Sequence, residues 1–108
     1  MSEGVVLEVT SAAWNREVLQ TESLVMVVFW AEWCKPCETI SQMVEELAKE
    51  YAGRIRIVRL NIDENADIAS TYKISIIPTI IFFNHGQKLH EMITAVPRVQ
   101  LKSAIESL

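Results

Sequence analysis

The feature that most constrains the fold is an apolar segment that leads directly into an amphipathic helix. Residues 24–30 read Leu-Val-Met-Val-Val-Phe-Trp. This segment is too short for a typical helix and too uniformly apolar for a half-exposed strand, so it predicts a central strand covered on both faces. From Cys34 to about Ala52, apolar residues recur at helical spacing, and Gly53 follows as a stop signal. A buried strand followed by a covering helix indicates an α/β protein.

Strands and helices continue to alternate along the rest of the chain. Further strands are predicted at residues 5–9, 55–62, 79–83 and 87–93. Shorter helices are predicted after Thr10, at residues 65–72 and from Pro97 onward. The order βαβαβαββα predicts parallel strand pairs with one antiparallel hairpin at an edge, and helices on both faces of the sheet. We expect a single domain over residues 1–108.

The composition argues against several classes of protein. Half of the residues are hydrophobic and 22% are charged, which is typical of a soluble globular domain. The longest apolar run, residues 24–31, is far short of the roughly 20 residues that cross a bilayer. The net charge is −4 without a basic cluster, and no signal peptide is visible. We expect a cytoplasmic monomer, or one in an organelle stroma or matrix if a targeting segment has been removed, that binds neither membranes nor nucleic acid.

The strongest sign of chemistry is the pair of cysteines, Cys34 and Cys37. A disulfide that closes so short a loop constrains the unfolded chain little, so the pair points to reactivity rather than stabilisation. At a helix start, unpaired N–H groups and the helix dipole favour a thiolate at Cys34, and Lys35 adds positive charge. Pro36 fits the first helical turn, and Cys37 lies one turn further on the same face. We expect Cys34 to attack a target disulfide and Cys37 to resolve the mixed disulfide.

Two other interpretations of the cysteine pair stay open. The pair could be half of a zinc site, but structural zinc needs four ligands and the sequence has no second cysteine pair. Two chains could also share an iron–sulfur cluster, with two thiolates from each. We expect no metal and no bound cofactor. Because the chain has no G-x-G-x-x-G fingerprint for a dinucleotide, its electrons must arrive by thiol exchange.

Two segments resemble the thioredoxin family. They are Phe29-Trp30-Ala31-Glu32-Trp33-Cys34-Lys35-Pro36-Cys37, similar to its active site, and Ile76-Ile77-Pro78-Thr79, similar to its cis-proline loop. The resemblance covers essentially the whole chain and implies the thioredoxin fold, a central five-stranded mixed sheet flanked by four helices. It implies a protein-disulfide oxidoreductase that reduces disulfide-containing target proteins. A thioredoxin reductase dependent on NADPH or ferredoxin would return it to the reduced form.

The same resemblance implies a site for the target chain. A shallow apolar groove would be formed by Trp33, Ile77, Pro78, Thr94 and Ala95. The Ile77–Pro78 bond would be cis and would face the cysteines. The backbone of the residue before this proline would pair with the extended target chain, as in strand addition.

The chain departs from the family pattern at positions that bear on the chemistry. Lys35 replaces the usual glycine, and a cation there should make the disulfide a stronger oxidant. Val28 replaces a buried aspartate that is thought to assist proton transfer at the resolving cysteine, and Arg59 stands at the matching lysine position without that partner. We expect slower or differently pH-dependent exchange and a more stable domain. Thr94 replaces a glycine and should narrow the groove. The alternative functions are a thiol oxidant or isomerase, or a binding module with the thioredoxin fold and weak or no reductase turnover.

Overall fold

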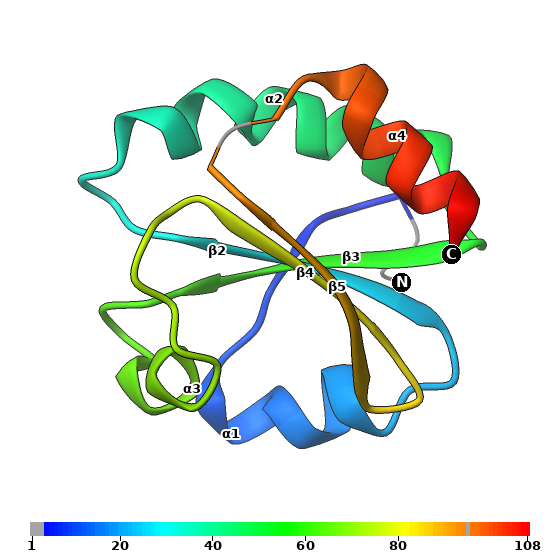
Figure 1. Cartoon of the computed structure of the whole chain (residues 1–108). Helices are drawn as coiled ribbons and strands as arrows, with labels where there is room; N and C mark the ends of the chain where they lie inside the picture. The colour runs from blue at the N-terminus through cyan, green and yellow to red at the C-terminus, as the bar shows by residue number, and fades with distance from the viewer. Residues whose placement is uncertain (1–3, 95) are drawn as a thin grey trace.

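The computed structural model describes residues 4–94 and 96–108, and its elements follow the expected alternation (Figure 1). In chain order they are β1 (Leu7–Glu8), α1 (Ser11–Trp14), the π-helical turn η1 (Asn15–Leu19), β2 (Leu24–Trp30), α2 (Lys35–Glu50), β3 (Ile55–Asn61), α3 (Ala66–Thr71), β4 (Thr79–Asn84), β5 (Gln87–Ile93) and α4 (Arg98–Ser107). The predicted α/β organisation is confirmed.

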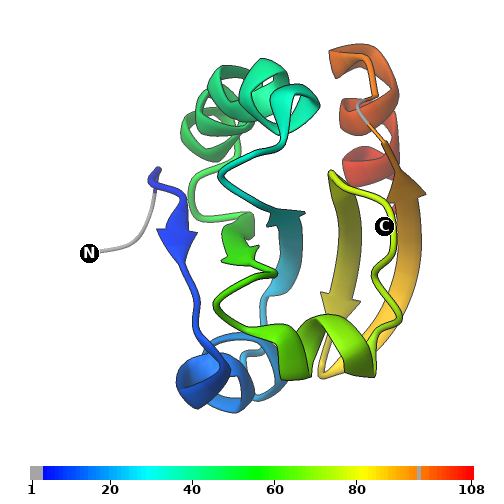
Figure 2. The ribbon, with the colours of Figure 1, turned by 90° about the vertical axis from the view of Figure 1, so that its left-hand side faces the viewer.

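The strands form one five-stranded mixed sheet in the order β1-β3-β2-β4-β5. Strands β1, β3 and β2 run parallel, whereas β4 is antiparallel to β2 and β5 is antiparallel to β4. Helices α2 and α4 cover one face of this sheet, and α1 and α3 cover the other (Figures 1 and 2). The architecture is therefore the thioredoxin fold that the sequence implied, with its antiparallel hairpin at one edge.

Strand β2 lies at the centre of the sheet, as its apolar sequence predicted. Residues 25–29 are buried, because β3 and β4 flank the strand and helices cover both faces. Successive side chains alternate between the faces. Val25, Val27 and Phe29 pack with α1 and α3, while Met26 and Val28 pack with α2 and α4. The strand thus carries the chain from the core directly to the loop before Cys34.

Three local features differ from the sequence prediction or add to it. Strand β1 has two residues instead of the expected five, since it is an edge strand that pairs only with β3. The first helix ends in a π-helical turn, which hydrophobic spacing does not reveal. In the hairpin between β4 and β5, His85 and Gly86 both have positive φ, at 52° and 80°. Gly86 also needs to lack a side chain, because a Cβ there would lie 2.9 Å from the carbonyl oxygen of Leu19.

Candidate redox site

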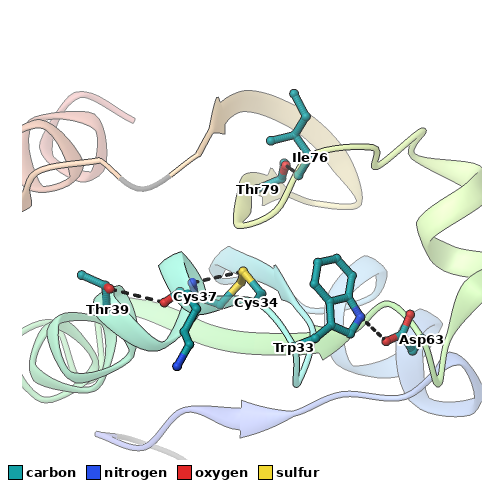
Figure 3. Close-up of a disulfide and its surroundings, with 8 residues drawn as sticks. Trp33, Cys34, Cys37, Thr39, Asp63, Ile76 and Thr79 are labelled. Carbon is teal, nitrogen blue, oxygen red and sulfur yellow. Dashed lines mark hydrogen bonds between the residues drawn. A yellow bond between two sulfur atoms is a disulfide. The ribbon is translucent and has the colours of Figure 1, made fainter.

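The two cysteines lie at the start of α2, directly after the central strand (Figure 3). Cys34 is the N-cap residue, and the backbone N–H of Cys37 donates a hydrogen bond to its Sγ at 3.1 Å. Lys35 and Pro36 occupy the first two helical positions and are exposed. The sulfurs of Cys34 and Cys37 form a disulfide, with Cα atoms 5.3 Å apart. A helix N-terminus therefore points its unpaired N–H groups and positive dipole end at Cys34.

Both cysteines are nearly covered by their surroundings. Cys34 is 3% exposed and Cys37 is 6% exposed, and Trp30, Ile62 and Ile77 pack against them. Ile77 precedes Pro78 through a cis peptide bond, so the expected loop geometry is present. The half-buried Ile77 contacts the cysteine pair, whereas Pro78 itself is buried.

The end of β5 adds the next part of the expected groove. The backbone N–H of Thr94 donates a 2.8 Å hydrogen bond to the carbonyl oxygen of Pro78, which places the exposed Thr94 beside the cis-proline loop. Thr94 has a φ of 68°, a region that β-branched residues rarely adopt. Ala95, the other residue expected in this segment, lies outside the described residues.

Trp33 is the most exposed aromatic side chain near the cysteines, at 67% of its surface. Its indole Nε1 donates a hydrogen bond of 2.8 Å to Oδ2 of Asp63, so one edge of the ring is held in place (Figure 3). The sequence did not single out Asp63 as a site residue. The two residues are 30 positions apart, and no motif links them.

Arg59 has a charged partner that the sequence analysis missed. Glu8, Arg59 and Val28 pair across β1, β3 and β2, so they form one row on the sheet. Nε of Arg59 donates to Oε1 of Glu8 at 2.6 Å, and the Arg59 guanidinium lies 4.4 Å from the ring centroid of Trp30. Trp30 Nε1 donates to the second oxygen of Glu8 at 3.0 Å. Arg59 lacks an acid at position 28, as expected, because the buried Val28 stands there, and parallel pairing of β1 with β3 brings Glu8 to it instead.

Val28 and Cys37 meet at a pocket of about 350 Å³ on the α2 face of the sheet. Its apolar wall includes Val28, Ile40 and Val44, and Cys37 also lines it. Charged groups at its rim belong to Glu32, Glu38, Glu45 and Arg59. Val28 is 5% exposed, so the position at which the family has an acid is filled by a buried aliphatic side chain.

The described residues contain no cluster with the make-up of a metal site. Within residues 4–94 and 96–108, no group of three or more His, Cys, Asp or Glu side chains is arranged so that it could hold a metal ion. His85 and His90 are exposed on the hairpin. In the same part of the chain, no helix combines the length and the apolar character needed to cross a membrane.

Comparison with known proteins gives a consistent result over nearly the whole chain. The family model for thioredoxin matches residues 5–107. The chain is 46% identical over 101 residues to "Thioredoxin M-type, chloroplastic" of Spinacia oleracea, which covers 94% of this chain and 56% of that protein. It is 41% identical to "Thioredoxin 1" of Nostoc sp. and 40% identical to "Thioredoxin" of Synechocystis sp., each over 92% of both chains. The chain thus spans just over half the length of the spinach relative and most of the cyanobacterial ones.

Proposed function

Because this chain belongs to the thioredoxin family and is a disulfide oxidoreductase, we propose that it reduces disulfide bonds in other proteins through Cys34 and Cys37. The thiolate of Cys34 attacks one sulfur of the target disulfide, and the other target sulfur leaves. Cys37 then attacks Cys34, which releases the second target sulfur and leaves the Cys34–Cys37 disulfide. Two electrons pass from the protein to the target, whose two cysteines end as thiols.

The observation that carries this proposal is the position of Cys34 as the N-cap of α2. Its Sγ accepts a hydrogen bond from the N–H of Cys37, and a thiolate would be the stronger acceptor. The helix dipole stabilises negative charge at the same place. The exposed Lys35 adds a cation beside it. These three effects favour Cys34 as the attacking sulfur and the inner Cys37 as the resolving one.

The target chain binds, in this proposal, along the segment next to the cysteines. Trp33, with its exposed ring, forms one side, and Ile77, Pro78 and Thr94 form the other. The backbone of Ile77 pairs with the extended target, as strand addition requires. The side chain of Thr94 reduces the space for the target and narrows the range of targets.

The partners follow from the chemistry of a dithiol that exchanges electrons with other thiols. A thioredoxin reductase dependent on NADPH or ferredoxin returns the disulfide to the dithiol, and disulfide-containing proteins are the targets. We assign the chain to the cytoplasm or to an organelle stroma. Relatives from cyanobacteria and one named as chloroplastic are compatible with either place. We further propose that residues 1–108 act as a single domain and as a monomer.

Insulin reduction by dithiothreitol tests the proposal, with Cys37→Ser and Cys34→Ser as matched variants. We expect the unaltered protein to accelerate the reaction and both variants to stay at the background rate. The Cys37→Ser variant should accumulate a mixed disulfide with the target, and the Cys34→Ser variant should not. An unaltered protein that is no faster than Cys37→Ser would contradict the proposal and favour a binding module.

A thiol oxidant or isomerase is a second candidate function, and Lys35 is the observation that favours it. A cation beside Cys34 stabilises the thiolate and therefore the reduced form, which raises the reduction potential. The potential of the Cys34–Cys37 couple, measured against glutathione, separates the two functions. A value near those of thioredoxins, about −270 mV, supports a reductase, and one near about −120 mV supports an oxidant. A Lys35→Gly variant should have a more negative potential than the unaltered protein.

A further inference from the structure

Of the two reacting cysteines, only the resolving one, Cys37, lines the pocket on the α2 face of the sheet. Cys37 lines it, whereas Cys34 and Ile77 do not. The target chain would cover the opposite side of the pair, where Ile77 packs. Cys37 is 6% exposed, so its thiol proton has little direct access to bulk water. A volume of about 350 Å³ is large enough for several water molecules, and the charged rim offers them hydrogen-bonding partners.

The apolar wall of this pocket has no proton acceptor at position 28, where the family has a buried acid. Val28 has no polar atom, and Arg59, its neighbour on β3, is a donor only. The charged groups that face the pocket are Glu32 from the loop before α2, Glu38 and Glu45 from α2, and Arg59 from β3. Arg59 is already bound to Glu8. The carboxylates at the rim are therefore the available acceptors.

Glu38 is the rim carboxylate on the same helical turn as Cys37. It lies in the first turn of α2, one residue after Cys37, while Glu45 lies eight residues beyond it, about 12 Å along the helix axis. Other acids on α2 are engaged with α4, since Glu46 pairs with Arg98 and Glu50 pairs with Lys102. Within residues 4–94 and 96–108, Glu38 makes no ion pair.

We propose that Glu38, acting through water in this pocket, takes the proton of Cys37 when that sulfur resolves the mixed disulfide. The S–H bond of Cys37 breaks and its proton moves through water to the Glu38 carboxylate. The thiolate of Cys37 then forms a bond to Sγ of Cys34, and the bond between Cys34 and the target breaks. The target sulfur leaves as a thiolate and is protonated by solvent. The inference rests on the dithiol exchange proposed above.

Two roles of Glu38 predict opposite effects of Glu38→Gln. If Glu38 acts only as a nearby negative charge, it disfavours a thiolate, and its removal should leave resolution unchanged or make it faster. If it accepts the proton, its removal should make resolution slower. General bases contribute about 10²–10⁴-fold, and for an exposed carboxylate that acts through water we expect a loss of about ten-fold. Removal of the charge should leave the attack by Cys34 unchanged or slightly faster.

Single-turnover kinetics with a disulfide-containing peptide separates the two steps. At low peptide concentration, the observed rate constant rises with concentration and reports the attack by Cys34. At high concentration it reaches a plateau, which reports resolution by Cys37. Acid quenching then measures the mixed disulfide directly. We expect Glu38→Gln to lower the plateau about ten-fold. Glu38→Asp should restore part of the rate, and Glu45→Gln, from the same pocket, should resolve at the unaltered rate.

Filling the pocket provides a second, independent variant. Ser41 lines the pocket one turn after Cys37, so Ser41→Leu should displace water and slow resolution without slowing attack. The matched control is Gln42→Leu, the next residue on the helix, which is exposed and outside the pocket. A plateau that stays unchanged or rises in Glu38→Gln would overturn the inference, as would a loss carried by Glu32→Gln or shared equally by Glu45→Gln. Failure of Cys37→Ser to form any mixed disulfide would instead refute the proposed function.

Discussion

The two faces of the sheet differ in their side chains. The core between the sheet and helices α1 and α3 contains a cluster of aromatic rings, whereas the core beneath α2 and α4 is mainly aliphatic and borders a pocket at Cys37. Trp14, Tyr72 and Phe83 lie in contact on the first face, with ring centroids 5.3–5.6 Å apart. On the second face, Val28 and its neighbours border the pocket at Cys37. The α1 and α3 face is thus closely packed with apolar side chains, while the α2 and α4 face is packed but also has a pocket that water can enter beside Cys37.

The two faces also hold their helices in different ways. Helix α4 buries Leu101 and Ile105 in the aliphatic core. Polar contacts also join it to the segment after α2, where Glu106 accepts a 2.8 Å hydrogen bond from Tyr51 and a 3.3 Å one from Arg54. Helix α1 instead inserts the buried ring of Trp14 between Phe29 and Tyr72. Exposed ion pairs contribute less than about 1 kcal/mol each, and buried aromatic rings contribute several times more. We therefore expect stability to depend more strongly on the aromatic face.

Trp14→Ala should have the largest effect, because it empties the centre of the aromatic cluster. Trp14 is 4% exposed, and we expect the free energy of unfolding in urea to fall by about 3–5 kcal/mol. Trp33→Ala is the matched control, since Trp33 is 67% exposed and should change stability by less than about 1 kcal/mol. Equal losses in the two variants would mean that the aromatic face has no special role in stability.

Val28→Asp tests whether the aliphatic face gains stability from having no buried acid. We expect a loss of about 3 kcal/mol at neutral pH, because a carboxylate is desolvated. Burial raises the pKa of the introduced carboxyl above its unfolded value of about 3.9. The penalty is thus complete above the raised folded pKa and disappears as the pH falls to the unfolded one. Val28→Asn controls for polarity and should lack this pH dependence, and an unchanged or higher stability of Val28→Asp at neutral pH would contradict the expectation.

Thr94→Gly should stabilise the protein slightly and widen its target range. A β-branched residue with φ of 68° is strained, and glycine removes that strain at some entropic cost, so we expect a gain of about 1 kcal/mol. His85→Gly, at φ of 52° in the distant hairpin, is the control for the backbone effect. Reduction rates on several protein disulfides should rise for Thr94→Gly and stay the same for His85→Gly. Equal rates for the unaltered protein, Thr94→Gly and His85→Gly would show that the side chain of Thr94 does not limit target binding.

Glu106→Gln should have the smallest effect and should depend on pH. Hydrogen bonds from Tyr51 and Arg54 hold the pKa of Glu106 below its ordinary value. A lowered folded pKa contributes stability above the unfolded pKa of about 4.3 and loses it as the pH falls through the folded value. Thermal unfolding should show a lower midpoint for the variant at neutral pH and a narrowing difference in acid. If the difference in unfolding midpoint between the two proteins does not change with pH, the contacts of Glu106 with Tyr51 and Arg54 stabilise the fold without the negative charge of Glu106.

Much of the fold could be predicted because local patterns specify it. The bounds of β2 and β5, residues 24–30 and 87–93, agree with the prediction, since apolar runs and the His85-Gly86 turn define them. Helix α2 covers residues 35–50 against a predicted 34–52, and ends of helices are the least certain part of any such prediction. The length of β1 was overestimated because an edge strand depends on its partner more than on its own residues.

The contacts that the sequence did not reveal all join distant parts of the chain. Trp33 and Asp63 are 30 residues apart, and Arg59 and Glu8 are 51 apart. Exposed charged residues pair with groups that the tertiary fold places near them, and their spacing in the sequence does not identify those partners. The predicted parallel pairing of the strand at residues 5–9 could have suggested a partner for Arg59, but strand register is needed to choose Glu8.

The amino-acid sequence alone predicted two cysteines one turn apart at the start of a helix, because helical spacing is a local property. Its resemblance to the thioredoxin family showed that Val28 stands where that family usually has a buried acid. Tertiary structure alone decided that Glu8 binds Arg59 and that Cys37 borders a hollow rimmed by carboxylates. Both depend on how β1, β3 and β2 align beneath α2, and that alignment is set by the packing of the whole chain.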